Sequence, residues 1–109
     1  MAIAILKGIT ASSGKAEGPV QIIKTKADLK KFKAGSILVA EMTNPSLVPA
    51  MMLAAGVITD IGGITCHAAI VCRELGLPCI VGTKDATKKL NNSMKVFMDA
   101  DKGTVEESK

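Results

Sequence analysis

The 109-residue sequence predicts a mixed α/β fold in one compact domain that spans residues 1–109. Short apolar runs bounded by Gly, Asn, Asp or Lys alternate with segments that carry helix start and stop signals. Hydrophobic residues make up 48% of the chain and charged residues 22%, a composition typical of globular proteins that excludes a disordered chain. A chain of this length buries roughly 65% of its unfolded surface, enough for a core without disulfides or metal.

Seven short segments are predicted to be strands, because each is apolar or alternating and ends at turn-forming residues. They cover residues 4–8, 19–23, 37–40, 57–59, 79–81, 95–99 and 104–106, and the last four residues are expected to form a free tail. The runs at 37–39 and 79–81 are apolar throughout. Such runs are typical of strands buried on both faces, so we expect helices on at least one face of the sheet.

Four helical segments alternate with these strands. They cover residues 27–32, residues 45–55, a third segment from Cys66 or His67 to Leu75, and a fourth from Thr83 or Asp85 to Leu90. The second has Thr43 or Asn44 as its cap, and Pro49 limits where its regular part begins. The third ends at Gly76, with Pro78 shortly after, which is the stop chemistry expected of a helix.

The loop before the third helix places the only histidine, His67, after the run Gly62-Gly63-Ile64-Thr65-Cys66. A helix start gathers unpaired N–H groups and the positive end of the backbone dipole, which stabilise anions. A neutral imidazole has a lone pair that acts as a nucleophile near pH 7. This position therefore favours a phosphoryl carrier. The alternative is a packed histidine, since His67 shares a helical face with Ile70, Val71 and Glu74.

The neighbours of His67 each have a structural alternative. Gly62 and Gly63 let a backbone approach a ligand, but glycine pairs are also ordinary turns. The Thr65 hydroxyl can donate to an anionic oxygen or cap the helix. Cys66 and Cys72 project about 240° apart on a helix, so we interpret them as packing residues and predict no metal site.

Composition excludes several classes of function. The net charge is +4, but the lysines are spread along the chain and there are two Phe and no Trp or Tyr, so nucleic acid is not an expected partner. The apolar run at 2–6 is too short for a membrane span. Three cysteines without a CxxC pair suggest a reducing cytoplasm. Residues 8–16 imitate a P-loop with the wrong glycine spacing and are predicted to be a loop between strands.

The run DIGGITCHAAIVCRELGLPCIVGT at 60–83 resembles the phosphohistidine signature of phosphoenolpyruvate-utilising enzymes. Those enzymes include phosphoenolpyruvate synthase, pyruvate phosphate dikinase and enzyme I of the sugar phosphotransferase system. The runs at 12–20, 35–60 and 98–105 follow the same family in order, so the resemblance covers nearly the whole chain. The TCHAAI core is most similar to the synthase and dikinase branch.

The resemblance implies a swivelling β/β/α domain whose histidine, matched by His67, is transiently phosphorylated. It implies that the group moves between a nucleotide-binding site and a phosphoenolpyruvate/pyruvate site. The expected phosphate-stabilising residues are Gly62, Gly63, Thr65, Cys66 and Ala68, with Arg73, a recurrent arginine of the following helix, as a secondary candidate. No cofactor is expected on this domain, and Mg²⁺ is expected on partner domains. At 91–92 two asparagines stand where many relatives have a glycine turn.

These observations leave three hypotheses. The first is a stand-alone, cytoplasmic phosphocarrier, a component of a phosphotransferase rather than a complete enzyme, because no ATP-binding domain or phosphoenolpyruvate-binding barrel fits in 109 residues. Its partners would be separate ATP-binding and phosphoenolpyruvate/pyruvate-binding proteins or subunits, which would dock around residues 43–51 and 60–67. The second is a non-catalytic regulatory or scaffold module that binds such an enzyme. The third is a fragment or separately encoded subunit of a larger phosphotransferase.

Overall fold

Eight short segments pair into one mixed sheet in the computed structural model, which describes residues 4–108. The strands are β1 Ala4–Lys7, β2 Ile9–Ser12, β3 Lys15–Ile22, β4 Ile37–Ala40, β5 Gly56–Thr59, β6 Cys79–Val81, β7 Lys95–Asp99 and β8 Thr104–Glu107. Their order across the sheet is β1-β8-β7-β3-β4-β5-β6-β2. β3, β4, β5 and β6 run parallel to one another, and the remaining pairs are antiparallel.

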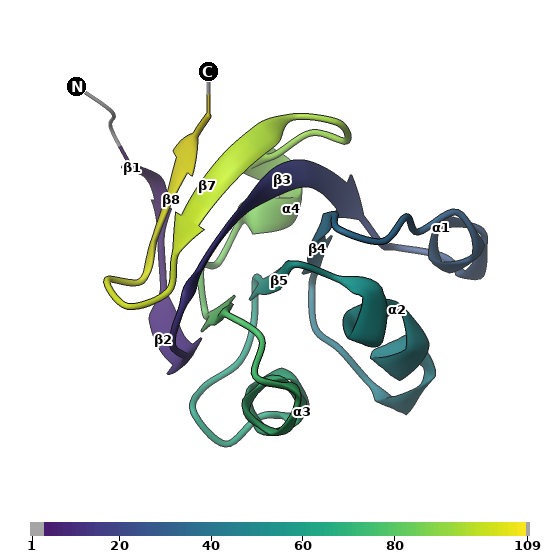
Figure 1. The fold of residues 1–109 in the computed structure, drawn as a ribbon, viewed down its shortest axis with the longest axis horizontal. Helices are drawn as coiled ribbons and strands as arrows, with labels where there is room; N and C mark the ends of the chain where they lie inside the picture. Colours follow the sequence, from purple (N-terminus) through teal and green to yellow (C-terminus); the bar gives the residue numbers. More distant parts are fainter. Residues whose placement is uncertain (1–3, 109) are drawn as a thin grey trace.

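The sheet is strongly curled, so that β2 at one end approaches the turn between β7 and β8. The Thr10 hydroxyl donates to the carbonyl of Ala100 at 2.5 Å, and the Gly8 amide donates to the carbonyl of Gly103 at 2.9 Å. Figure 1 shows β1, β8, β7 and β3 curving away from β4 and β5. Side chains fill the concave, inner face of the curled sheet. The helices pack against the opposite face of the parallel strands.

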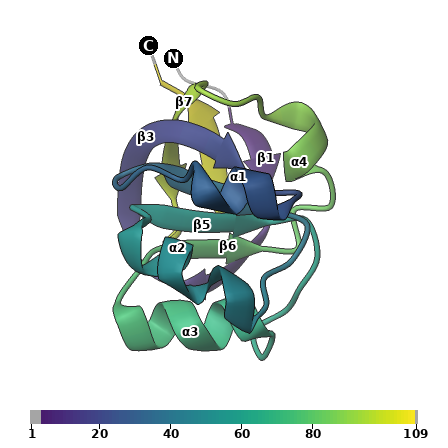
Figure 2. The same cartoon turned by 90° about the vertical axis from the view of Figure 1, so that its right-hand side faces the viewer.

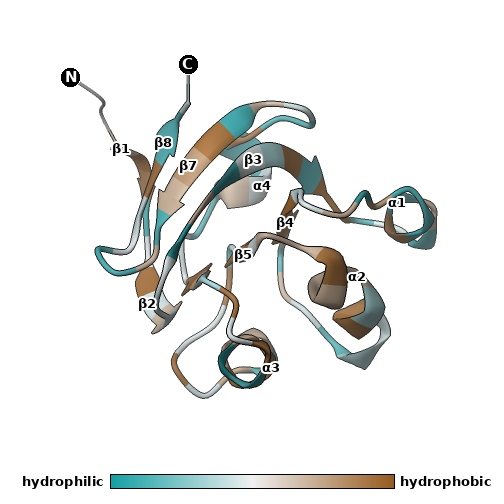
Figure 3. Cartoon of the chain, in the orientation of Figure 1, coloured by the Kyte–Doolittle hydropathy of each residue, from teal (hydrophilic) through white to brown (hydrophobic). Residues whose placement is uncertain are grey.

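Helices cover that opposite face. They are α1 Lys26–Lys30, the 3₁₀ turn η1 Pro45–Leu47, α2 Val48–Leu53 and α3 His67–Leu75, whereas α4 Ala86–Lys89 lies apart from them. In Figure 2, which looks onto this side, α1 lies above β5, α2 lies next to β6, and α3 lies at the bottom of the view. α1 has no buried residue and is held by a capping box between Thr25 and Asp28, whereas α2 buries Ala50 and Met51. In Figure 3, α1 is mostly hydrophilic, whereas α2 is more hydrophobic.

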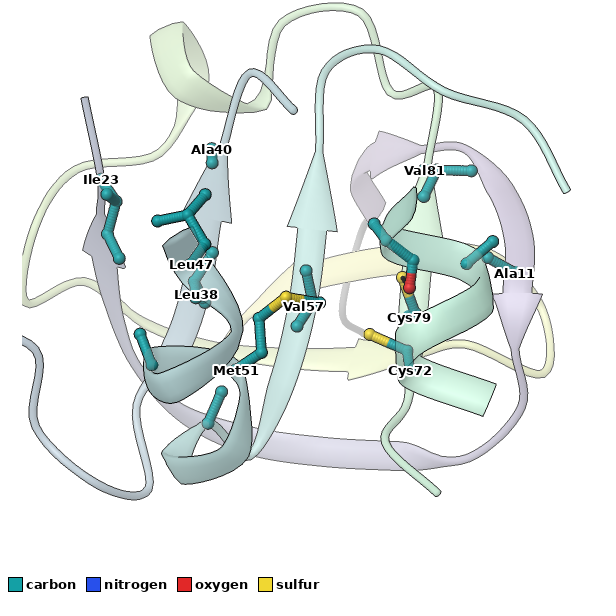
Figure 4. Close-up of a cluster of buried hydrophobic side chains, with 14 residues drawn as sticks. Ala11, Ile23, Leu38, Ala40, Leu47, Met51, Val57, Cys72, Cys79 and Val81 are labelled. Carbon is teal, nitrogen blue, oxygen red and sulfur yellow. Dashed lines mark hydrogen bonds between the residues drawn. The ribbon is translucent and has the colours of Figure 1, made fainter. Parts of the chain in front are cut away.

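Alternation along the parallel strands divides the core in two. On β4, Leu38 packs toward the helices, whereas Ile37 and Val39 pack into the curl of the sheet. On β5, Val57 and Ile58 divide in the same way. Figure 4 shows the helix-side cluster, in which Leu38, Val57 and side chains of α2 and α3 meet. Both faces of these strands are therefore buried, which is why their sequences are apolar throughout.

The predicted α/β class is confirmed, with one strand missed. Residues 8–16 were expected to form a loop, but Ile9–Ser12 forms β2, and β3 begins at Lys15 rather than at position 19. β2 pairs with β6, which lies about 70 residues further along the chain, and both Ile9 and Thr10 are exposed. A strand whose partner is remote and in which only Ala11 is buried has little local hydrophobic pattern.

The chain end and the turn at 91–93 also differ from expectation. Glu106 and Glu107 pair with β7 instead of belonging to a free tail, while residue 109 and residues 1–3 lie outside the described residues. In the turn, the left-handed residue is Ser93, with φ of 71°, rather than an asparagine. Asn92 instead accepts a hydrogen bond from the Ile22 amide at 2.7 Å.

Candidate functional site

His67 is the first residue of α3 and follows a loop that leaves the carboxyl end of β5. Ligands of parallel sheets bind at this edge, where strand ends and helix starts meet. The imidazole is half-buried, and Nδ1 lies 2.8 Å from Oγ1 of Thr43, which is buried in the segment after β4. One ring nitrogen is therefore engaged by the protein, and Nε2 is the nitrogen left for other chemistry.

Thr43 was expected to cap a helix or line a docking surface. The structure gives the capping role to Asn44, whose side chain accepts from the Ser46 amide, and turns the Thr43 hydroxyl toward His67. Its role at the site was therefore missed. The signal available in the sequence was a hydroxyl residue three positions beyond the apolar run at 37–40, at the sheet edge where parallel strands end.

The start of α3 has no side-chain cap. Its N-cap residue is Cys66, which makes no side-chain cap hydrogen bond, and Ile70 is the first residue whose amide donates within the helix, to the carbonyl of Cys66 at 3.1 Å. Of the two roles open to Thr65, capping is not the one observed, because Thr65 lies one position before the N-cap with its side chain exposed. The amides of His67, Ala68 and Ala69 are therefore available to an acceptor such as a phosphoryl oxygen.

The backbone conformation requires glycine at position 62 of the loop, but not at position 63. Gly62 has φ of 137°, and a Cβ at this position would lie 2.8 Å from Sγ of Cys66. Gly63 has no positive φ, and a Cβ there would meet nothing within 4 Å. The fold therefore requires Gly62, whereas the space beside Gly63 is open.

We expect matched alanine substitutions to separate these roles. Gly62→Ala should lower the free energy of unfolding by about 1–3 kcal/mol, because it forces an alanine into a conformation rare for residues with a Cβ. Gly63→Ala should leave it within about 0.5–1 kcal/mol of the parent value, since neither strain nor a clash arises. Urea unfolding followed by circular dichroism measures both. Equal destabilisation by the two variants would contradict this account of the loop.

Asp60 is the first residue after β5, and its hydrogen bonds hold the start of the His67 loop against α4. Its carboxylate accepts from the Thr87 amide at 2.9 Å and from the Thr87 hydroxyl at 2.5 Å, and it is 8% exposed. Its backbone carbonyl accepts from the Lys84 amide at 2.8 Å. Both carboxylate oxygens are thus engaged by α4, so Asp60 ties the loop to that helix.

Asp60→Ala is expected to lower the free energy of unfolding by about 1–3 kcal/mol, because it leaves the part-buried amide and hydroxyl of Thr87 without their acceptor. Asp85→Ala is the matched control. Asp85 makes an exposed ion pair with Lys89 at 3.6 Å, and loss of such a pair costs at most about 1 kcal/mol. Thermal unfolding measures the loss of stability in each variant. A smaller loss of stability in Asp60→Ala than in Asp85→Ala would contradict the proposed role of the Asp60–Thr87 hydrogen bonds.

With this geometry in place, comparison with known proteins identifies the domain. Residues 32–103 match the family model described as PEP-utilising enzyme, mobile domain. The chain belongs to this family. The predicted resemblance is confirmed, and His67 with its loop lies inside the matched segment of the mobile domain.

Relatives with more than half of their aligned residues identical to this chain are much longer than this mobile domain. The chain is 55% identical over 101 residues to the phosphoenolpyruvate synthase of Pyrococcus furiosus, covering 93% of this chain and 12% of that protein. It is 52% identical over 105 residues to a probable phosphoenolpyruvate synthase of Archaeoglobus fulgidus, covering 96% of this chain and 14% of the relative. The chain therefore spans about one eighth of the length of the relatives it matches.

Solved structures share the fold of the mobile domain. A solution structure of enzyme I is 30% identical, with a TM-score of 0.61, covering 71% of this chain and 32% of that one. The holo-form of aconitase X from Thermococcus kodakaraensis has a TM-score of 0.73 at 24% identity, covering 95% and 98% of the two chains. The second likeness concerns the fold alone.

Two other predicted site residues have contacts within the mobile domain. The Cys66 amide donates to the carbonyl of Gly63 at 3.2 Å, and its Sγ lies beside Gly62, which supports the packing interpretation of this thiol. Arg73 lies six residues along α3 from His67, about 9 Å of helix rise. Its Nε donates to the carbonyl of Ala11 at 2.7 Å and ties α3 to β2.

The remaining chemistry of the mobile domain is limited. Within residues 4–108, no three His, Cys, Asp or Glu side chains gather as a metal site. Cys72 and Cys79 are both free thiols. Hydrogen bonding to the Cys72 thiol and burial raise the pKa of Cys79 far above its ordinary value, so Cys79 stays a neutral thiol. No helix in the described part is long and apolar enough to cross a membrane.

Proposed function

We propose that this domain carries a phosphoryl group on Nε2 of His67, receiving it at one partner site and giving it up at another. The observation that carries the proposal is the hydrogen bond between Nδ1 of His67 and the Thr43 hydroxyl. When Nδ1–H donates to Thr43, the lone pair is on Nε2, the nitrogen free to attack. The family assignment supports the same chemistry.

The transfer step balances without loss of a proton. The Nε2 lone pair forms a bond to phosphorus, and the bond from phosphorus to the donor oxygen breaks, its electron pair leaving with the donor. The ring then carries positive charge, which Thr43 stabilises as acceptor at Nδ1–H. The amides of His67 and Ala68, with the Thr65 hydroxyl, stabilise the phosphoryl oxygens. The reverse step passes the group to the acceptor.

The backbone at Gly63 is accessible to a phosphoryl donor. Among the described residues, no atom lies within 4 Å of the position that a Cβ of Gly63 would take, so a phosphoryl donor can come close to the backbone there. Asp60 is engaged by Thr87, and we therefore assign the Mg²⁺ that phosphoryl donors require to the partner sites. The mobile domain supplies the nucleophile and the partner supplies the metal.

We propose an ATP-binding protein and a phosphoenolpyruvate/pyruvate-binding protein as these partners. The relatives named phosphoenolpyruvate synthase support both types of site, because the matched segment is one part of their much longer chains. A regulatory or scaffold role without phosphotransfer is the competing function. Co-purification of either partner with the chain, followed by phosphoryl exchange between ATP and phosphoenolpyruvate in the mixture, tests the separate-partner arrangement, and its absence would contradict it.

Intact-mass measurement tests the carrier function directly. The chain is incubated with phosphoenolpyruvate, and separately with ATP, each with cell extract, and analysed under alkaline conditions because phosphoramidates are acid-labile. We expect a gain of one phosphoryl mass that disappears on acid treatment. An acid-stable adduct, or none with either donor, would favour the scaffold function instead.

A further inference from the structure

A groove of about 580 Å³ lies beside the His67 loop, at the carboxyl edge of β3 and β4. Its walls come from the segments after these two strands, from α1, from η1 and from α4. Ile23 and Leu47 form an apolar floor and are almost completely buried, whereas Lys24, Lys26 and Lys88 are exposed around it. The groove thus combines an apolar base with three positive charges.

Within the part of the chain that the structure describes, the lysines of the groove have no carboxylate partner within 4 Å. Among residues 4–108, the one ion pair within 4 Å is Lys89 with Asp85. Glu41 lines the groove but makes no such pair, and the whole chain has a net charge of +4. An occupant with negative charge would therefore gain attraction without first breaking an existing pair.

The uncharged polar side chains of the groove are already engaged within the chain. Thr25 accepts from the Asp28 amide, Asn44 accepts from the Ser46 amide, and the Thr87 hydroxyl donates to Asp60. Small-molecule sites need convergent polar groups that are free to orient the ligand. What remains free here is an apolar floor with three exposed ammonium groups and the single carboxylate of Glu41, which fits a protein segment with an apolar side chain between carboxylates.

The groove is continuous with the surface around His67. Met42 lines the groove and precedes Thr43, the residue bonded to His67. Met42 is 51% exposed, and Ile61 and Ile64 of the loop are 51% and 58% exposed. The Ile61 amide donates to the carbonyl of Glu41 at 2.9 Å, so the two exposed segments lie side by side. A partner that reaches Nε2 would cover this apolar surface and the groove together.

We infer that the groove binds an acidic segment of a phosphoryl-exchanging partner protein. An apolar side chain of that segment fills the space over Ile23 and Leu47, and carboxylates on either side pair with Lys24, Lys26 and Lys88. The inference rests on the proposed function for the identity of the partner. Beyond that function, the inference specifies that the partner docks through an apolar side chain and carboxylates. Because these ion pairs are exposed, salt should weaken docking.

NMR titration of the ¹⁵N-labelled chain tests this with the peptide acetyl-Glu-Asp-Leu-Glu-Asp-amide as the probe. At roughly millimolar peptide we expect amide shifts at Lys24, Met42 and Lys88. The affinity should fall about tenfold in about 0.5 M NaCl and in the double variant Lys24→Glu, Lys88→Glu. The matched control is the double variant Lys15→Glu, Lys102→Glu, which reverses the charge of two lysines that are exposed near the opposite end of β3. It should bind the peptide like the parent.

Two parallel titrations decide against other occupants. If ATP or inorganic phosphate moves the same amides at lower concentration than the peptide, the groove is a small-anion site and the inference is overturned. It is also overturned if the peptide moves no groove amide or if the control variant loses binding equally. None of these measurements uses phosphoryl transfer, so their failure leaves the carrier function standing, and a failed phosphorylation assay leaves the peptide result standing.

Discussion

His67→Gln is expected to lower the rate of phosphoryl incorporation by roughly 10³-fold or more, because the nucleophile itself is removed. The free energy of unfolding should change by only about 1 kcal/mol, since the half-buried ring makes one hydrogen bond. Phosphorus NMR of the reaction mixture and intact mass under alkaline conditions measure the incorporation. Thermal unfolding of the same preparation is the control for folding.

The outcome that contradicts this prediction is specific. If the acid-labile adduct persists in a folded His67→Gln variant, the phosphoryl group is attached elsewhere. If the parent chain acquires no adduct and the variant is equally inert, the fold has been kept without the chemistry. Only loss of an adduct that the parent forms supports His67 as the carrier.

Thr43→Val is expected to slow phosphorylation of His67 by roughly 10–100-fold, because a hydrogen bond that stabilises charge contributes about 1.5–3 kcal/mol and each 1.36 kcal/mol is tenfold in rate. Valine keeps the shape of threonine but cannot accept from Nδ1–H. Thr43→Ser is the matched control, since it keeps the hydroxyl, and its rate should stay within about threefold of the parent.

A second measurement distinguishes positioning from a general loss of packing. The ¹⁵N shifts of the imidazole report which ring nitrogen carries the proton. We expect the parent and Thr43→Ser to hold it on Nδ1, and Thr43→Val to show a mixture of tautomers. Equal rates and equal ring shifts in the valine and serine variants would show that Thr43 does not orient the ring.

Local chemistry made much of this molecule predictable. α3 begins and ends as its sequence indicates, because a glycine loop precedes His67 and Gly76 supplies the left-handed C-cap with φ of 71°. The doubly buried strands were recognisable, because a strand covered on both faces has no polar positions to alternate. Where the signal was weak, as in β2, the segment was assigned to a loop, since strand pairing with β6 is a property of the folded chain.

The sequence by itself determined the family and the place where His67, the proposed nucleophile, begins a helix, because both depend on neighbouring residues in one continuous motif. Only the tertiary structure decided which ring nitrogen is free, that Asp60 holds α4, and that three lysines surround one groove. Thr43 and His67 are 24 residues apart in the chain, and their contact exists because parallel pairing of β4 and β5 brings the two strand ends to one edge of the sheet.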